Sequence, residues 1–124
     1  MVTSLAGLRV FVVEDDMMVS MLVEDMLADF GCVQIGPAAR LDEAVALLSR
    51  SEPDCAILDV NLAGVSVLPV ADLLQARGVP YAFASGYADV GLRPQDSETL
   101  LLQKPFTEVD LARILTSLSK DKLG

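Results

Sequence analysis

The stretch LRVFVVEDDMMVSMLVEDMLADFG, residues 8–31, decides the fold of this chain. Its first six residues are rich in aliphatic and β-branched side chains, which is typical of a strand buried on both faces. From Met17 to Phe30 the apolar residues recur at the spacing of an amphipathic helix, and Gly31 is suited to end that helix. A buried strand followed by an amphipathic helix predicts one βα unit of a parallel sheet.

The same alternation continues along the chain. Further strands are predicted at 33–36, 55–58, 81–84 and 100–103, the first ended by Pro37, with helices at 41–48, 67–74 and 111–118. We therefore expect an α/β fold with a doubly wound, five-stranded parallel sheet and right-handed crossovers. Gly and Pro weaken any helix at 88–99, so a loop or a short, irregular fourth helix is expected there. The chain is predicted to form one domain, 1–124, with its core at about 7–120.

Composition excludes several classes of protein. The net charge of −9, with nine Lys and Arg, argues against nucleic-acid binding through a basic surface. The chain has no histidine, which excludes His-based triads, His metal sites and a phosphohistidine carrier within it. No secretory signal and no apolar run of about 20 residues is present, so a cytoplasmic protein is expected, without membrane attachment. Cys32 and Cys55 form no CxxC pair and are expected to be free, buried thiols.

Polar residues follow four of the five predicted strands. In open parallel sheets, ligands bind beyond the carboxyl ends of the strands, so these residues are expected to converge. Packed carboxylates attract a hard cation such as Mg²⁺, and a carboxylate can attack phosphorus to form an acyl phosphate. An ammonium and a hydroxyl can then share the charge of the phosphoryl oxygens. The residues are Glu14, Asp15 and Asp16 after the first strand, Asp59 after the third, Ser85 after the fourth and Lys104 after the fifth.

Each of these residues has a simpler interpretation when taken alone. Asp16 is placed to cap the helix that begins at Met17, and Asp59 could be a solvated loop acid. Lys104 could be a surface lysine, and Ser85 a turn serine. Their joint placement, at successive strand ends, favours a single site over separate structural roles.

Four short motifs carry a family resemblance that spans almost the whole chain. They are VVEDD at 12–16, ILDVNL at 57–62, FASGY at 83–87 and KPF at 104–106. In this order, at these strand ends, they resemble the CheY-like receiver domain of bacterial two-component response regulators. The resemblance implies a flavodoxin-like sheet with strand order 2-1-3-4-5, a phosphoacceptor function and a Mg²⁺ cofactor.

The resemblance also implies the ligands of the cation. Asp15, Asp59 and the backbone carbonyl of Asn61 would hold Mg²⁺, and Glu14 would act through a water molecule. Asp16 is a further candidate ligand, with capping as its alternative. Asp59 follows Asp15 by 44 positions, which agrees with the family pattern.

The remaining roles concern the phosphoryl group. Asp59 would accept it from the phosphohistidine of a sensor histidine kinase or histidine phosphotransfer protein. Lys104 would contact the phosphoryl oxygens, Ser85 would take the switch position, and the peptide bond between Lys104 and Pro105 would be cis. The predicted function is that of a stand-alone response regulator, not an enzyme with an external substrate. It would signal by a conformational change towards a downstream protein or by phosphorelay.

The chain departs from the family pattern at several positions. Ala63 and Val67 replace the usual Pro and Gly after the acceptor, and Leu101 replaces an aromatic residue. These features are similar to a subgroup of single-domain receivers with a Phe-Ala-Thr-Gly-Tyr motif, in which Ser85 stands at the Thr position. Since Leu101 cannot hydrogen-bond, our hypothesis is that Tyr87 and residues 88–99 take over the switch. The alternative is that Tyr87 only packs against the loop.

Two competing functions stay open. A degenerate receiver would act only in protein docking, and an Asp-nucleophile phosphohydrolase would release phosphate. Asn61 stands where such hydrolases carry a second Asp, which argues against hydrolysis. Met17, Met18 and Met21 are interpreted first as packing residues and second as an adaptable docking face for the kinase partner. A monomer is expected.

Overall fold

The computed structural model describes residues 5–86 and 100–123. Five strands form one parallel sheet in the order β2-β1-β3-β6-β7, which confirms the predicted order 2-1-3-4-5. The elements are β1 (Arg9–Val13), α1 (Met17–Phe30), β2 (Val33–Ala38), α2 (Leu41–Ser49), β3 (Cys55–Asp59), β4 (Asn61–Leu62), β5 (Val65–Ser66), α3 (Leu68–Ala76), β6 (Tyr81–Ser85), β7 (Leu100–Gln103) and α4 (Glu108–Leu123).

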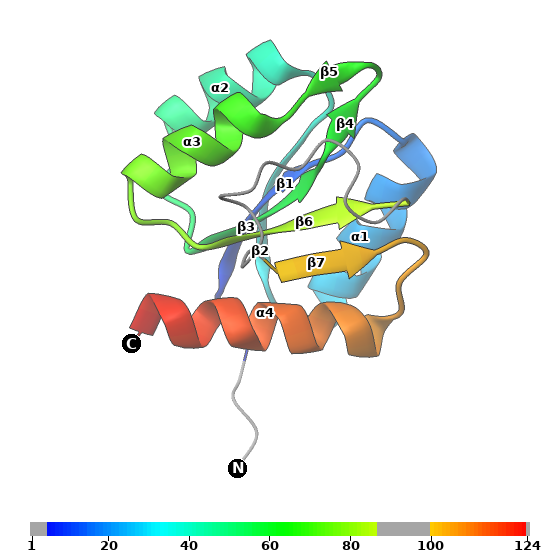
Figure 1. Ribbon diagram of the computed structural model, residues 1–124. Helices are drawn as coiled ribbons and strands as arrows, with labels where there is room; N and C mark the ends of the chain where they lie inside the picture. The colour runs from blue at the N-terminus through cyan, green and yellow to red at the C-terminus, as the bar shows by residue number, and fades with distance from the viewer. Residues whose placement is uncertain (1–4, 87–99, 124) are drawn as a thin grey trace.

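Helices cover both faces of the sheet (Figure 1). Alternate residues of β1 serve the two sides: Phe11 packs in a core layer with residues of α2 and α3, whereas Val10 and Val12 pack with residues of α1 and α4. All three side chains are at most 1% exposed. Burial on both faces explains why the strands are apolar without alternation, as the sequence predicted.

Strand β2 differs from the prediction because it continues past Pro37 to Ala38. Proline has no N–H to donate, so within sheets it is confined to edges and irregular positions. β2 is an edge strand, and its register with β1 shifts next to Pro37. The Ala38 carbonyl then accepts a hydrogen bond from the Glu14 N–H at 2.9 Å.

A small antiparallel hairpin, β4–β5, lies between β3 and α3 and was not predicted. Ala63 and Gly64 form its two-residue tip, with φ angles of 51° and 92°. Two successive positive φ angles are the signature of a type I′ turn, whose twist suits a tight hairpin. The strands have only two residues each, too short for a period-two pattern to reveal them.

Glycines end two of the helices, as was predicted for Gly31. Gly31 and Gly78 adopt left-handed conformations after α1 and α3. The Arg77 guanidinium donates to the carbonyls of Leu48 and Ser51, each at 2.7 Å, and thereby ties the end of α3 to the end of α2. No helix in the described ranges is long and apolar enough to cross a membrane.

The prediction of free, buried thiols is confirmed for Cys55, whereas Cys32 is free but less buried than predicted. Both cysteines are free, with Cys55 buried and Cys32 half-buried. Burial raises the pKa of the Cys55 thiol to about 12, so this side chain behaves as a small apolar group.

The predicted irregular fourth helix and Tyr87 lie outside the described residues.

Candidate metal centre

The predicted site residues gather at the carboxyl edge of the sheet. Glu14 and Asp15 follow β1, Asp59 ends β3, Ser85 ends β6 and Lys104 follows β7. Backbone hydrogen bonding between β6 and β7 continues past the end of β7, where the Lys104 N–H donates to the Ser85 carbonyl at 2.8 Å. The backbone therefore fixes the origins of these side chains before any ligand is considered.

Three carboxylates form one cluster. Glu14, Asp15 and Asp59 each offer an oxygen, and these oxygens lie within 4.8 Å of one another. Glu14 is 5% and Asp59 is 8% exposed, while Asp15 faces solvent. A buried group of acids open to solvent on one side fits a hard cation that prefers oxygen ligands and keeps some of its water. The donor set therefore suits Mg²⁺.

Lys104 lies within the same cluster as its counter-ion. Its Nζ is 2.7 Å from Oε1 of Glu14 and 3.5 Å from Oδ1 of Asp59. Burial alone would lower the pKa of Lys104, but the hydrogen bond to Glu14 and the charge of Asp59 raise this pKa above its usual value. Lys104 is thus a permanent ammonium that can pair with a carboxylate now and with a phosphoryl oxygen later.

The carboxyl group of Asp59 resists ionisation. Burial is the main cause that raises its pKa, from 3.8 to about 7. A hydrogen bond with Asp15 and the negative charge of Glu14 act in the same direction, whereas Lys104 acts against them. A cation at the cluster would favour the ionised form, which is the nucleophilic form of a carboxylate.

Asp16 takes the capping role that was one of its two interpretations. Its Oδ1 accepts hydrogen bonds from the N–H groups of Met18 and Val19, at 2.9 and 3.3 Å. Its own N–H donates to Oε2 of Glu14 at 3.0 Å, so it also helps to orient that carboxylate. Within the described residues, the cluster able to hold a cation comprises Glu14, Asp15 and Asp59 without Asp16.

This geometry predicts different results for two substitutions of Asp16. Asp16→Ala removes the cap and is expected to cost about 1 kcal/mol of unfolding free energy, measured by urea titration. Asp16→Asn keeps a capping oxygen and should cost less than half of that. A large loss of Mg²⁺ affinity in Asp16→Asn would instead make the Asp16 carboxylate a ligand.

Asn61 begins β4, two residues beyond Asp59. It faces Ser66 in the hairpin, and the N–H of Val67 donates to the carbonyl of Val60 at 3.1 Å. In an antiparallel ladder, hydrogen-bonded pairs alternate with non-hydrogen-bonded pairs. The pair of Asn61 and Ser66 is therefore of the second kind, and the Asn61 carbonyl points away from β5. This direction is compatible with the predicted backbone ligand.

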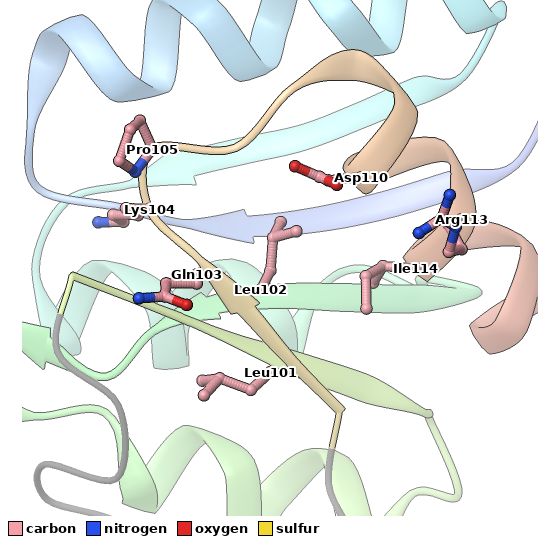
Figure 2. Close-up of a pocket in the computed structure, with 8 residues that line it drawn as sticks. All are labelled: Leu101, Leu102, Gln103, Lys104, Pro105, Asp110, Arg113 and Ile114. Carbon is pink, nitrogen blue, oxygen red and sulfur yellow. The ribbon is translucent and has the colours of Figure 1, made fainter.

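The residues of the fifth sheet strand border a separate hollow. A cavity of about 530 Å³ lies beside β7 and α4. Figure 2 shows the Lys104 amine directed away from Asp110 and Arg113 in this cavity's lining. The Lys104–Pro105 peptide bond is cis. Leu101 lines this cavity and also packs against the core layer of α2 and α3, so it fills an apolar position. Lys104 is shared between this cavity and the carboxylate cluster, whereas Glu14, Asp15 and Asp59 do not line the cavity.

The β4–β5 hairpin and the contact between Asp16 and Glu14 were not predicted from the sequence. The adjacent Ala63 and Gly64 were the available signal for the hairpin, but Ala is not one of the residues that type I′ turns favour. The contact from the Asp16 N–H to Glu14 depends on the turn of the chain after β1. The available signal for this contact was the run of three consecutive acids, Glu14, Asp15 and Asp16.

The known proteins that are similar to this chain agree with the geometry of the site. The profile of the response regulator receiver domain family matches residues 10–116. The chain is 29% identical over 119 residues to the sensory transduction protein LytT of Bacillus cereus, covering 93% of this chain and 48% of LytT. The chain spans about half the length of the curated relatives it matches.

Two solved structures are also similar. The solution structure of SdrG from Sphingomonas melonis has a TM-score of 0.81 and 34% identity, covering 94% of this chain and 98% of that chain. The receiver domain of the sensor histidine kinase PA1611 from Pseudomonas aeruginosa has a TM-score of 0.78 and 25% identity, covering 93% and 99%. That structure has a magnesium ion coordinated in its active-site cleft.

Proposed function

This chain belongs to the response regulator receiver domain family of two-component signalling, and from that premise we propose that Asp59 accepts a phosphoryl group in the presence of Mg²⁺. The observation that carries the proposal is the convergence of Glu14, Asp15, Asp59 and Lys104 from three separate strand ends. Similarity to SdrG, together with the FASGY motif, supports placing the chain in the single-domain subgroup.

Asp15, Asp59 and the Asn61 carbonyl would hold the cation, with Glu14 acting through water. A bound Mg²⁺ supplies positive charge that lowers the pKa of Asp59 and neutralises phosphoryl oxygens. One oxygen of Asp59 would hold the cation, and the other would act as the nucleophile.

The transfer step uses groups already in place. An Asp59 oxygen forms a bond to phosphorus while the P–N bond to the donor histidine breaks, and its electron pair returns to the imidazole. The Lys104 ammonium moves from the carboxylates towards the phosphoryl oxygens, and Ser85, which is 9% exposed, approaches them from the end of β6. The chain has no histidine, so the donor is another molecule.

A surface next to the site suits the donor protein. Met17, Met18 and Met21, in the first turns of α1, are 75%, 77% and 60% exposed. No Lys or Arg occurs between Arg9 and Arg40, so every charged residue near these methionines in the sequence is acidic. We propose that this face receives an apolar, basic-rimmed surface of the sensor kinase or phosphotransfer protein, in agreement with the docking interpretation.

The experiment that tests the function uses a small-molecule phosphodonor such as phosphoramidate. With Mg²⁺, wild-type protein is expected to gain the mass of one phosphoryl group, localised to Asp59 by peptide mapping. Asp54→Asn is the matched control, because Asp54 lies before β3 at the opposite edge of the sheet and should leave the reaction unchanged.

The alternatives predict other results. A phosphohydrolase would release phosphate steadily without accumulating the modified protein, and a docking-only receiver would not react. Either result would contradict the proposal. If Asp59 is phosphorylated as proposed, a further test is transfer of the phosphoryl group from a phosphorylated kinase to this protein and back. That test distinguishes a relay from an adaptor that binds a downstream protein.

A further inference from the structure

The β4–β5 hairpin connects the phosphoacceptor to α3 and carries Asn61 on its first strand. We infer that the tip of this hairpin, Ala63 and Gly64, controls how well the Asn61 carbonyl is presented to the cation. Ala63 and Gly64 are thus positioning residues for Mg²⁺, and Ala63 holds the affinity below its attainable value. The inference rests on the proposed function, because it concerns the same cation.

The register of the hairpin determines the direction of the carbonyl. Leu62 pairs with Val65, and Asn61 pairs with Ser66. A register shift of one residue in either strand would exchange hydrogen-bonded and non-hydrogen-bonded pairs. The Asn61 carbonyl would then point towards β5 instead of away from it. In a two-residue hairpin the turn sets the register, so the tip acts on the ligand from two positions away.

The tip is strained at one of its two residues. Both φ angles are positive, 51° at Ala63 and 92° at Gly64. Glycine adopts this conformation without cost, but an alanine Cβ makes it unfavourable. Type I′ turns favour Asn-Gly in these two places. The chain therefore has the preferred residue at the second position and a disfavoured one at the first.

Packing holds the base of the hairpin more firmly than its tip. Val60, Leu62 and Val67 are at most 5% exposed and belong to the core layer of α2 and α3. Val65 is 48% exposed, and Ala63 is exposed. A groove of about 540 Å³ separates the hairpin from the start of α2, and both Ala63 and Val65 line it. The tip therefore has space to open while the base stays in the core.

An equilibrium between a closed and an open tip would couple strain to metal affinity. Mg²⁺ binds best to the closed form, so the apparent dissociation constant rises as the closed fraction falls. A substitution that favours positive φ at the tip should tighten Mg²⁺ binding, and one that disfavours it should weaken binding. Backbone strain elsewhere in the molecule should lower the free energy of unfolding without changing the Mg²⁺ affinity.

Three substitutions test the inference by isothermal titration of metal-free protein with MgCl₂, paired with urea unfolding in EDTA. Ala63→Asn is expected to tighten the dissociation constant about twofold to fivefold, because Asn tolerates positive φ. Gly64→Ala is expected to weaken it about fivefold, which corresponds to about 1 kcal/mol.

Gly78→Ala is the matched control. Gly78 has a φ of 71°, and neither it nor Gly64 has an atom within 4 Å of an added Cβ, so both substitutions impose backbone strain without a clash. Gly78 follows α3, at the end of the sheet away from the carboxylates, so its substitution should lower stability and leave Mg²⁺ affinity unchanged. Equal Mg²⁺ affinity in Gly64→Ala, Gly78→Ala and the wild type would overturn the inference. A wild-type protein that binds no Mg²⁺ would instead overturn the proposed function.

Discussion

The Asp59→Asn variant is expected to lose all phosphoryl acceptance and, in metal-free buffer at pH 8, to be more stable than the wild type. The loss follows because an amide is not a nucleophile. The gain, on the order of 2 kcal/mol, follows because the folded protein no longer holds an ionised carboxylate beside Glu14 in a buried position. Intact-mass analysis measures the first effect, and urea unfolding in EDTA measures the second.

The stability of the wild type should depend on pH with a definite sign. The pKa of Asp59 rises from 3.8 to about 7 in the folded state, so between these values the folded protein binds more protons than the unfolded chain. Stability contributed by Asp59 therefore falls as pH rises from about 4 to 7 and is constant above that range. In Asp59→Asn this component of the pH dependence should be missing.

Asp54→Asn again serves as the control. Asp54 accepts a hydrogen bond from the Arg9 N–H at 2.9 Å and is remote from the cluster. Its substitution should not stabilise the protein at pH 8. If Asp59→Asn were destabilising under metal-free conditions, the attraction of Lys104 would outweigh burial, and the raised pKa would be wrong.

Removal of Lys104 is expected to have an effect of similar size and opposite sign. Lys104→Met should lower the unfolding free energy at pH 8 without metal by about 2 kcal/mol, because two mostly buried carboxylates lose their counter-ion. Since the pKa of folded Lys104 lies above its usual value, its contribution is fully present at pH 8. Added Mg²⁺ should restore most of the loss by supplying positive charge at the same place.

Arg40→Met provides the comparison for this variant. Arg40 pairs with Asp42 at 3.2 Å, but the two side chains are 74% and 72% exposed. Exposed pairs contribute roughly 0–1 kcal/mol, so this substitution should have a small effect that Mg²⁺ does not change. Equal losses of unfolding free energy in Arg40→Met and Lys104→Met, or no recovery of Lys104→Met on adding Mg²⁺, would show that Lys104 is not the counter-ion of the carboxylates.

The sequence predicted the sheet and the converging acids because both depend on short, regular patterns. Buried strands are continuous in apolar character, and the residue after each strand falls at the same edge in any doubly wound sheet. That rule alone placed Asp15, Asp59 and Lys104 together, without knowledge of any distance. The family motifs then supplied roles that spacing could not.

Other features depend on tertiary context that local patterns do not carry. Pro37 was expected to end its strand, but the position at the sheet edge tolerates a proline. Asp16 had two compatible roles, and only the turn after β1 directs its oxygen to the N–H groups of Met18 and Val19. The switch proposed for Tyr87 lies outside the described residues and stays a prediction.

The outer border of β2 has a consequence for the behaviour of the protein at high concentration. An open sheet edge can act as a template on which another chain adds a strand and begins a fibril. Here Pro37 offers no N–H to an incoming chain, and the neighbouring Gly36, with a φ of 103°, interrupts the regular spacing of donors and acceptors. The irregular end of β2, next to the Ala38 carbonyl that accepts from the Glu14 N–H, is therefore a poor template for an added strand.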